Sequence, residues 1–159
     1  PTGAASDPTP TASADDFCEA VTTAITTFDT AADTYINQVL AAVAAAGISN
    51  DLSGINALGP ALNDAAITSR EHMYDAYEAA SDPAAKDGIA GMIAYLDSYL
   101  IPSAVVMTGA SDFDQLSADL SALTQANLSL IEAQSGHATA VIEHTELRCD
   151  TEIDSIFAP

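Results

Sequence analysis

Three histidines and two methionines are the residues of this sequence whose side-chain chemistry and spacing most resemble a binding site. They are His72, Met73, Met92, His137 and His144. His137 and His144 are seven residues apart, which places them on one face of a helix. Imidazole nitrogens and thioether sulfurs are ligands of haem iron and of copper. The five residues are therefore candidate ligands of a haem or a transition metal.

The same residues also have an ordinary structural interpretation. His137 and His144 flank the apolar stripe of their helix, and methionine commonly fills gaps in helical cores. The Glu-x-x-His pairs of di-iron bundles are missing, because Ser69, Gln134 and Val141 stand three residues before the histidines. On this interpretation the protein has no cofactor.

Four tyrosines form a second candidate set, and each combines an apolar ring with a polar hydroxyl. Side chains of this kind on two neighbouring helices could line a groove for a small apolar ligand. Their ordinary position is the edge of a hydrophobic core. The four residues are Tyr74, Tyr77, Tyr95 and Tyr99.

Recognisable catalytic motifs are absent from the sequence. It contains no G-x-S-x-G elbow, no P-loop, no H-E-x-x-H helix and no dinucleotide-binding glycine fingerprint. Neither cysteine belongs to a C-x-x-C motif, which argues against thioredoxin-like exchange and covalent haem attachment. We therefore expect a protein that is not an enzyme.

The charge of the chain restricts its partners. The formal net charge is −20, because 23 acidic residues are opposed only by Arg70, Lys86 and Arg148. Nucleic-acid affinity depends on lysine and arginine, and anionic lipids attract the same residues, so neither partner is expected. No apolar run approaches the roughly 18 residues that cross a bilayer, so no transmembrane segment is expected either.

Apolar residues recur every three or four positions in four stretches of the chain, which predicts four long helices. Gly47 is expected to end the first helix, and Gly59–Pro60 to divide the second region into a short and a longer helix. Pro102 is expected to kink the third helix or to end it. The fourth should begin at Ser111–Asp114 and extend at least to Cys149. The stripe of the first helix is Phe17, Val21, Ile25, Phe28, Ala32, Tyr35, Val39 and Val43.

Short connections between long helices predict antiparallel neighbours. The expected fold is all-α, an antiparallel up-down-up-down four-helix bundle with kinked second and third helical regions. In that topology the start of the first helix and the end of the last lie at the same end of the bundle. Cys18 and Cys149 occupy these two places, so we expect them to form a disulfide.

A structural disulfide indicates an oxidising compartment, so the protein is expected outside the cell or on its surface. Residues 1–12 are rich in Pro, Thr and Ser and are expected to form a flexible tether. Residues 13–157 should form a single helical domain. A lipid anchor upstream of Pro1 would attach such a tether to the envelope.

These expectations favour a non-catalytic interaction or accessory protein with a protein partner at the cell envelope. The alternative is an extracellular carrier of haem, a transition metal or an apolar molecule. The carrier would use the His/Met set or the tyrosines described above.

Overall fold

The computed structural model describes residues 14–156, and this part of the chain is all-helical, as predicted. The expected tether, residues 1–12, lies outside the described residues, and so do residues 13 and 157, the expected bounds of the domain. The described elements are α1 (Ala14–Asp33), η1 (Thr34–Val39), α2 (Leu40–Ser49), α3 (Ser53–Ala79), α4 (Pro83–Tyr95), η2 (Leu96–Leu100), α5 (Ile101–Thr108), α6 (Phe113–Ala126) and α7 (Leu128–Cys149). The two η elements are π-helical turns within longer helices.

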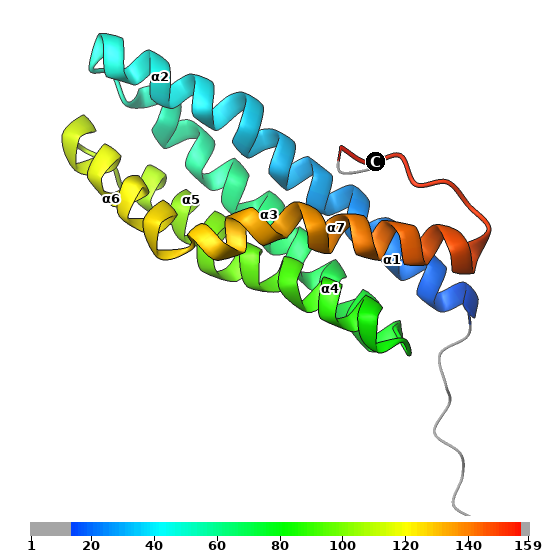
Figure 1. Cartoon of the computed structure of the whole chain (residues 1–159). Coiled ribbons are helices and arrows are strands. Elements are labelled where there is room, and N and C mark those ends of the chain that lie inside the picture. The colour runs from blue at the N-terminus through cyan, green and yellow to red at the C-terminus, as the bar shows by residue number, and fades with distance from the viewer. Residues whose placement is uncertain (1–13, 157–159) are drawn as a thin grey trace, which may run out of the picture.

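The predicted disulfide between Cys18 and Cys149 is confirmed, with the two Cα atoms 5.8 Å apart. It connects residues 131 positions apart in the sequence, so it encloses almost all of the described chain. Figure 1 shows the start of α1 beside the end of α7, where the disulfide joins the first helix to the last.

The hydrophobic interior consists of two clusters. The disulfide-end core lies between α1, α3, α4 and α7 and includes Phe17, Phe28, Met73, Met92 and Leu96. The smaller distal core lies between α2, α3, α5 and α6 and includes Val39, Ile55, Leu62, Met107 and Leu116. The two cores occupy opposite ends of the elongated molecule (Figure 1).

The apolar stripe predicted for the first helix is turned inward. Six of its eight residues are buried, and Tyr35 and Val43 are partly buried. The predicted end at Gly47 is wrong, because the helix continues to Ser49 and Asn50 takes the left-handed conformation with φ 54°. Gly47 has a packing role instead. A Cβ atom there would lie 3.0 Å from the ring of Phe113.

The second helical region is not divided at Gly59–Pro60, because α3 is continuous and contains Pro60. Close packing against α5 explains this continuity. A Cβ on Gly59 would lie 2.7 Å from the backbone nitrogen of Thr108, so the glycine allows the two helices to approach closely. The Asn56 amide donates to the carbonyl oxygens of Met107 and Ala110 and fixes the same contact. Tertiary packing therefore overrides the local helix-breaking tendency of proline.

Pro102 does not end the third helix, which continues through it as α4, η2 and α5. The π-helical turn Leu96–Leu100 ends two residues before it, and the N–H of Ile101 donates to the carbonyl of Leu96, five residues back. This local rearrangement of the hydrogen bonds occurs where the proline nitrogen has no proton to donate.

The fourth helical region is interrupted, contrary to the expectation of one helix. Asn127 separates α6 from α7, with φ −116° and ψ 16°, and its side-chain amide donates to the carbonyl of Leu123. Asp112 rather than Ser111 caps α6, because its carboxylate accepts the N–H of Gln115. The side-chain bond of Asn127 competes with the helical pattern and explains the interruption.

Within the described residues one helix, Pro83–Thr108, is long and apolar enough to cross a membrane by length and composition alone. Half of its most apolar stretch is buried inside the protein, where it contributes Ile89, Met92, Leu96 and Leu100 to the disulfide-end core. The sequence predicts no such segment because this helix has no uninterrupted apolar run of sufficient length: it contains Lys86, Asp87 and Asp97.

Removing the disulfide should destabilise the protein without changing its helices. In the double variant Cys18→Ser/Cys149→Ser the unfolded chain regains the entropy of a long open loop, so the free energy of unfolding should fall by about 4–5 kcal/mol. For a chain of this size the melting temperature should fall by roughly 10–20 °C. Thermal melts followed by circular dichroism measure both properties. Identical melting of variant and parent under oxidising conditions would contradict the stabilising role.

The close approach at Gly59 gives a second prediction. Gly59→Ala places a methyl group against the Thr108 backbone, so it should lower the free energy of unfolding by about 1–3 kcal/mol. Gly54→Ala is the matched control on the same helix, because a Cβ there meets nothing within 4 Å. Alanine is the better helix former, so the control should be neutral or more stable by up to about 1 kcal/mol. Chemical denaturation measures both, and equal effects would refute the packing explanation.

Candidate functional site

His72 lies on the surface of α3, facing α1. Its Nδ1 atom is 3.9 Å from a carboxylate oxygen of Asp75, and its side chain is 39% exposed. Together with Asp16 and Glu19 of α1, both residues line a surface hollow of about 400 Å³. Four potentially charged side chains thus border this hollow, and only His72 can carry a positive charge.

His137 packs against the backbone of α4. A Cβ on Gly91 would lie 2.4 Å from the imidazole ring, so the ring occupies the space that a side chain at Gly91 would need. One turn away, a Cβ on Gly88 would lie 2.6 Å from Val141. The two glycines therefore allow α4 and α7 to approach closely, and His137 forms part of that contact.

His144 belongs to a cluster beside the disulfide. Its ring meets Phe17 edge-on, with centroids 5.9 Å apart, and its Nδ1 atom is 3.9 Å from a carboxylate oxygen of Asp82. Its Nε2 atom is buried and has no hydrogen-bond partner. Asp82 caps α4. The hydrogen bond from the backbone N–H of Ala85 lowers the pKa of this carboxyl below its usual value, and the proximity of His144 contributes.

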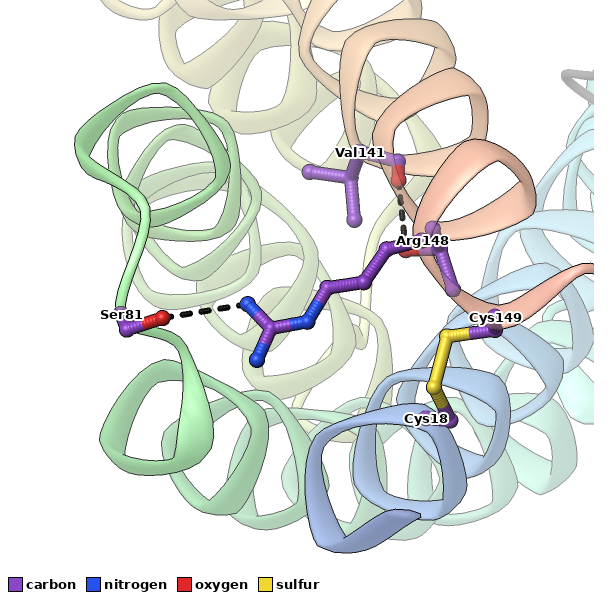
Figure 2. Close-up of a disulfide and its surroundings, with 6 residues drawn as sticks. Cys18, Ser81, Val141, Arg148 and Cys149 are labelled. Carbon is purple, nitrogen blue, oxygen red and sulfur yellow. Dashed lines mark hydrogen bonds between the residues drawn. A yellow bond between two sulfur atoms is a disulfide. The ribbon is translucent and has the colours of Figure 1, made fainter. Parts of the chain in front are cut away.

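Arg148 completes this cluster. Its guanidinium lies over the ring of Phe17, 4.6 Å from the centroid, and donates to the hydroxyl of Ser81, 3.1 Å away. Figure 2 shows the side chain extending from α7, next to Cys149, across to the connection before α4. These contacts join three chain segments at the disulfide end. They give the cluster a structural role.

The five predicted His and Met ligands lie in different environments. Met73 and Met92 are completely buried in the disulfide-end core, and the three histidines contact different partners. In residues 14–156 no group of three or more His, Cys, Asp or Glu side chains is arranged to hold a metal ion. The three histidines therefore lie in three separate environments, and the two methionines lie in the core.

The predicted tyrosines separate into two pairs. Tyr74 and Tyr77 lie on the surface of α3, and the amine of Lys86 is 4.7 Å from the centroid of the Tyr77 ring. Tyr95 and Tyr99 are buried, with ring centroids 5.5 Å apart. The two pairs therefore do not face each other across one groove.

Tyr35, which the sequence places only in the apolar stripe, is the residue that completes the buried pair. Its hydroxyl forms a short hydrogen bond with the hydroxyl of Tyr99, which also lies 3.2 Å from the Thr124 hydroxyl. Tyr35 and Tyr99 both lie in π-helical turns, η1 and η2. Such turns re-aim side chains and are frequent at functional sites. Apolar periodicity contains no signal for them.

The tyrosine cluster consists of Tyr35, Tyr95 and Tyr99; the Tyr35 and Tyr99 hydroxyls share a hydrogen bond, and the Tyr95 ring packs against that of Tyr99. Burial raises the pKa of Tyr35 above its ordinary value, and the hydrogen bond with Tyr99 raises it further. Burial also raises the pKa of Tyr95. Tyr35 and Tyr95 remain protonated at neutral pH, and the hydrogen bond between Tyr35 and Tyr99 is a polar contact between helices, which fits a structural role.

Comparison of the chain with protein-family models, curated proteins and solved structures found no match. The function of the protein is therefore inferred from the chemistry of the chain itself.

The raised pKa values predict how stability depends on alkaline pH. Above about pH 10 the tyrosines of the unfolded chain lose their protons, whereas Tyr35 and Tyr95 keep theirs in the folded protein. Ionisation then favours unfolding, so the contribution is complete below about pH 10 and declines above it. Between about pH 8 and pH 11, the melting temperature of the double variant Tyr35→Phe/Tyr95→Phe should fall by less than that of the parent. Equal losses in parallel melts would contradict this assignment.

Proposed function

We propose that this protein is a non-catalytic interaction protein of the cell envelope, exported or tethered to the surface, that binds a protein partner. The disulfide supports the location, because such crosslinks persist in oxidising compartments and are rare in the cytosol. The tether would be the segment of residues 1–12, with attachment through a lipid anchor upstream of it.

We further propose that the helices form an up-down-up-down four-helix bundle. The short connections at residues 50–52, 80–82 and 109–112 support this topology. Packing contacts support it as well, because α1 packs on α3, α3 on α4, α4 on α7, and α7 back on α1. In such a bundle the disulfide closes the ring at the one end where the first and last helices meet.

A single observation carries the proposed binding function: each basic side chain is engaged within the chain itself. Arg70 pairs with Asp97 at 3.0 Å, Lys86 lies over Tyr77, and Arg148 lies over Phe17. With 23 acidic residues against these three, most carboxylates of the chain have no lysine or arginine to oppose them. A surface of this kind attracts cationic partners and repels other anionic macromolecules.

Crosslinking on intact producing cells tests the proposal. An affinity-tagged protein should yield a specific covalent adduct with one envelope protein after denaturing purification. The adduct should be missing when the crosslinker is omitted. Recovery of the uncrosslinked chain alone, over a range of crosslinker lengths, would contradict the proposed function.

The carrier alternative has its own measurement. A Soret band on addition of haemin that disappears in His72→Ala or His144→Ala would indicate haem binding. A melting temperature that rises with added copper or zinc would indicate metal binding. We expect neither change, because the three histidines have different partners and no group of three or more His, Cys, Asp or Glu side chains in residues 14–156 is arranged to hold a metal ion.

A further inference from the structure

One end of the molecule combines acidic side chains with exposed apolar ones. We define the distal half as residues 36–64 and 102–122, which surround the distal core. This half contains no lysine, arginine or histidine. No side chain of the distal half can therefore carry a positive charge that would neutralise a carboxylate. Its acidic residues are Asp51, Asp64, Asp112, Asp114 and Asp119.

The first part of this surface is the outer ridge of α2. No charged residue lies between Asp33 and Asp51, although the chain as a whole has a net charge of −20. Leu40 is 49% exposed and Ile48 is 91% exposed, two turns apart on the same helix, and Ile36 precedes them at 49%. Among the described elements α2 packs mainly on α3 and on η1, its own continuation. The ridge is therefore an unpartnered apolar surface in this chain.

The second part is a hollow of about 340 Å³ directly beyond the end of α2. It lies between two helix connections, and Asp51 and Asp112 both line it. The Asp51 carboxylate accepts the N–H of Ser53, and the Asp112 carboxylate accepts the N–H of Gln115, each at 2.9 Å. The hydrogen bond from Ser53 lowers the pKa of Asp51 below its usual value. Local backbone geometry thus holds two carboxylates at the hollow.

The ridge ends at Ile48, and the lining of the hollow begins two residues later, at Asn50. Leu52 and Phe113 supply an apolar wall of the hollow, and the Phe113 ring also covers Gly47 near the end of α2. A lysine or arginine side chain has the matching form, with an apolar stem and a charged head. Its stem would lie on Phe113 and its head between Asp51 and Asp112.

We propose that this distal surface binds a cationic amphipathic helix of the partner protein. Apolar residues of that helix lie on Leu40 and Ile48, and a lysine or arginine enters the hollow beside Asp51 and Asp112. This inference rests on the proposed function and names the surface and the partner chemistry. Charge favours such a helix over a second copy of the chain, because a second copy adds another net charge of −20.

A synthetic peptide provides a defined probe of the surface. The probe is a fluorescein-labelled amphipathic helix of about 16 leucine and lysine residues, and its scrambled isomer has the same charge but no apolar face. Fluorescence anisotropy should show tighter binding of the amphipathic peptide, and its affinity should fall as salt is added. Equal affinity for the scrambled peptide would overturn the proposal, because it would show attraction by net charge alone.

Two pairs of variants locate the binding surface. Leu40→Gln/Ile48→Gln should weaken peptide binding about tenfold. Its control is Tyr74→Gln/Leu147→Gln, which removes apolar side chains of similar exposure, 49% and 88%, elsewhere on the protein. The control should stay within about twofold of the parent.

The acidic pair is tested in the same way. Asp51→Asn/Asp112→Asn removes both charges while asparagine can still accept the backbone N–H groups, so the fold is retained. This variant should also weaken binding about tenfold. Its control, Glu71→Gln/Glu78→Gln, removes two exposed charges from the disulfide end of α3 and should stay within about twofold of the parent. Losses that are equal in test and control variants would overturn the proposal.

Two further outcomes separate this inference from its rivals. Sedimentation should show a monomer; a dimer that dissociates in Leu40→Gln/Ile48→Gln would show that a second copy covers the ridge, which overturns the inference.

In the crosslinking experiment, an adduct that forms with the parent and is lost in both distal variants supports the inference. An adduct unaffected by these variants overturns the inference but leaves the proposed function standing. Absence of any adduct with the parent contradicts the proposed function itself.

Discussion

Charge imbalance is the constraint on which the rest of this structure depends. With 23 acidic and three basic residues, ion pairs cannot be the main attraction between the helices, and the folded state must overcome repulsion among its carboxylates. Two apolar cores and one disulfide supply the cohesion instead. Close approach of helices at Gly59, Gly88 and Gly91 increases the contact between the packed surfaces. All three basic side chains make contacts within the chain, so the exterior is predominantly anionic.

The two halves of the molecule differ in how completely their helices cover the core. At the disulfide end α1, α3, α4 and α7 pack around one cluster, and Arg148 links α7 to the connection before α4. Towards the distal end α2 packs mainly on α3, and α6 mainly on α5 and α7. Tyr35 packs against both cores, and its hydrogen bond to Tyr99 joins the two π-helical turns. The tyrosine cluster thus connects a closed half to a more open one.

This difference between the halves connects the fold to the proposed function. In the proposed function the crosslinked end would maintain the shape of the molecule, and the end with exposed apolar side chains and carboxylates would offer a surface to the partner. Leu40 and Ile48 belong to the longest uninterrupted helical segment but lie where few neighbouring helices cover it. Their exposure is a consequence of helix arrangement. Hydrophobicity alone would have placed them in a core.

The sequence by itself determined the helical class, the inward-facing stripe of the first helix and the Cys18–Cys149 pair, because helical periodicity is a local property and the two cysteines lie at the ends of the helical region. It did not determine where helices are interrupted. Pro60 is accommodated because Gly59 allows close packing on α5, a contact between residues distant in sequence. The sequence also did not predict that the three histidines have different partners, or that Tyr35 forms a hydrogen bond with Tyr99. Only the tertiary structure decided these features, because hydrogen bonds between helices and the register of π-helical turns have no periodic signal in the chain.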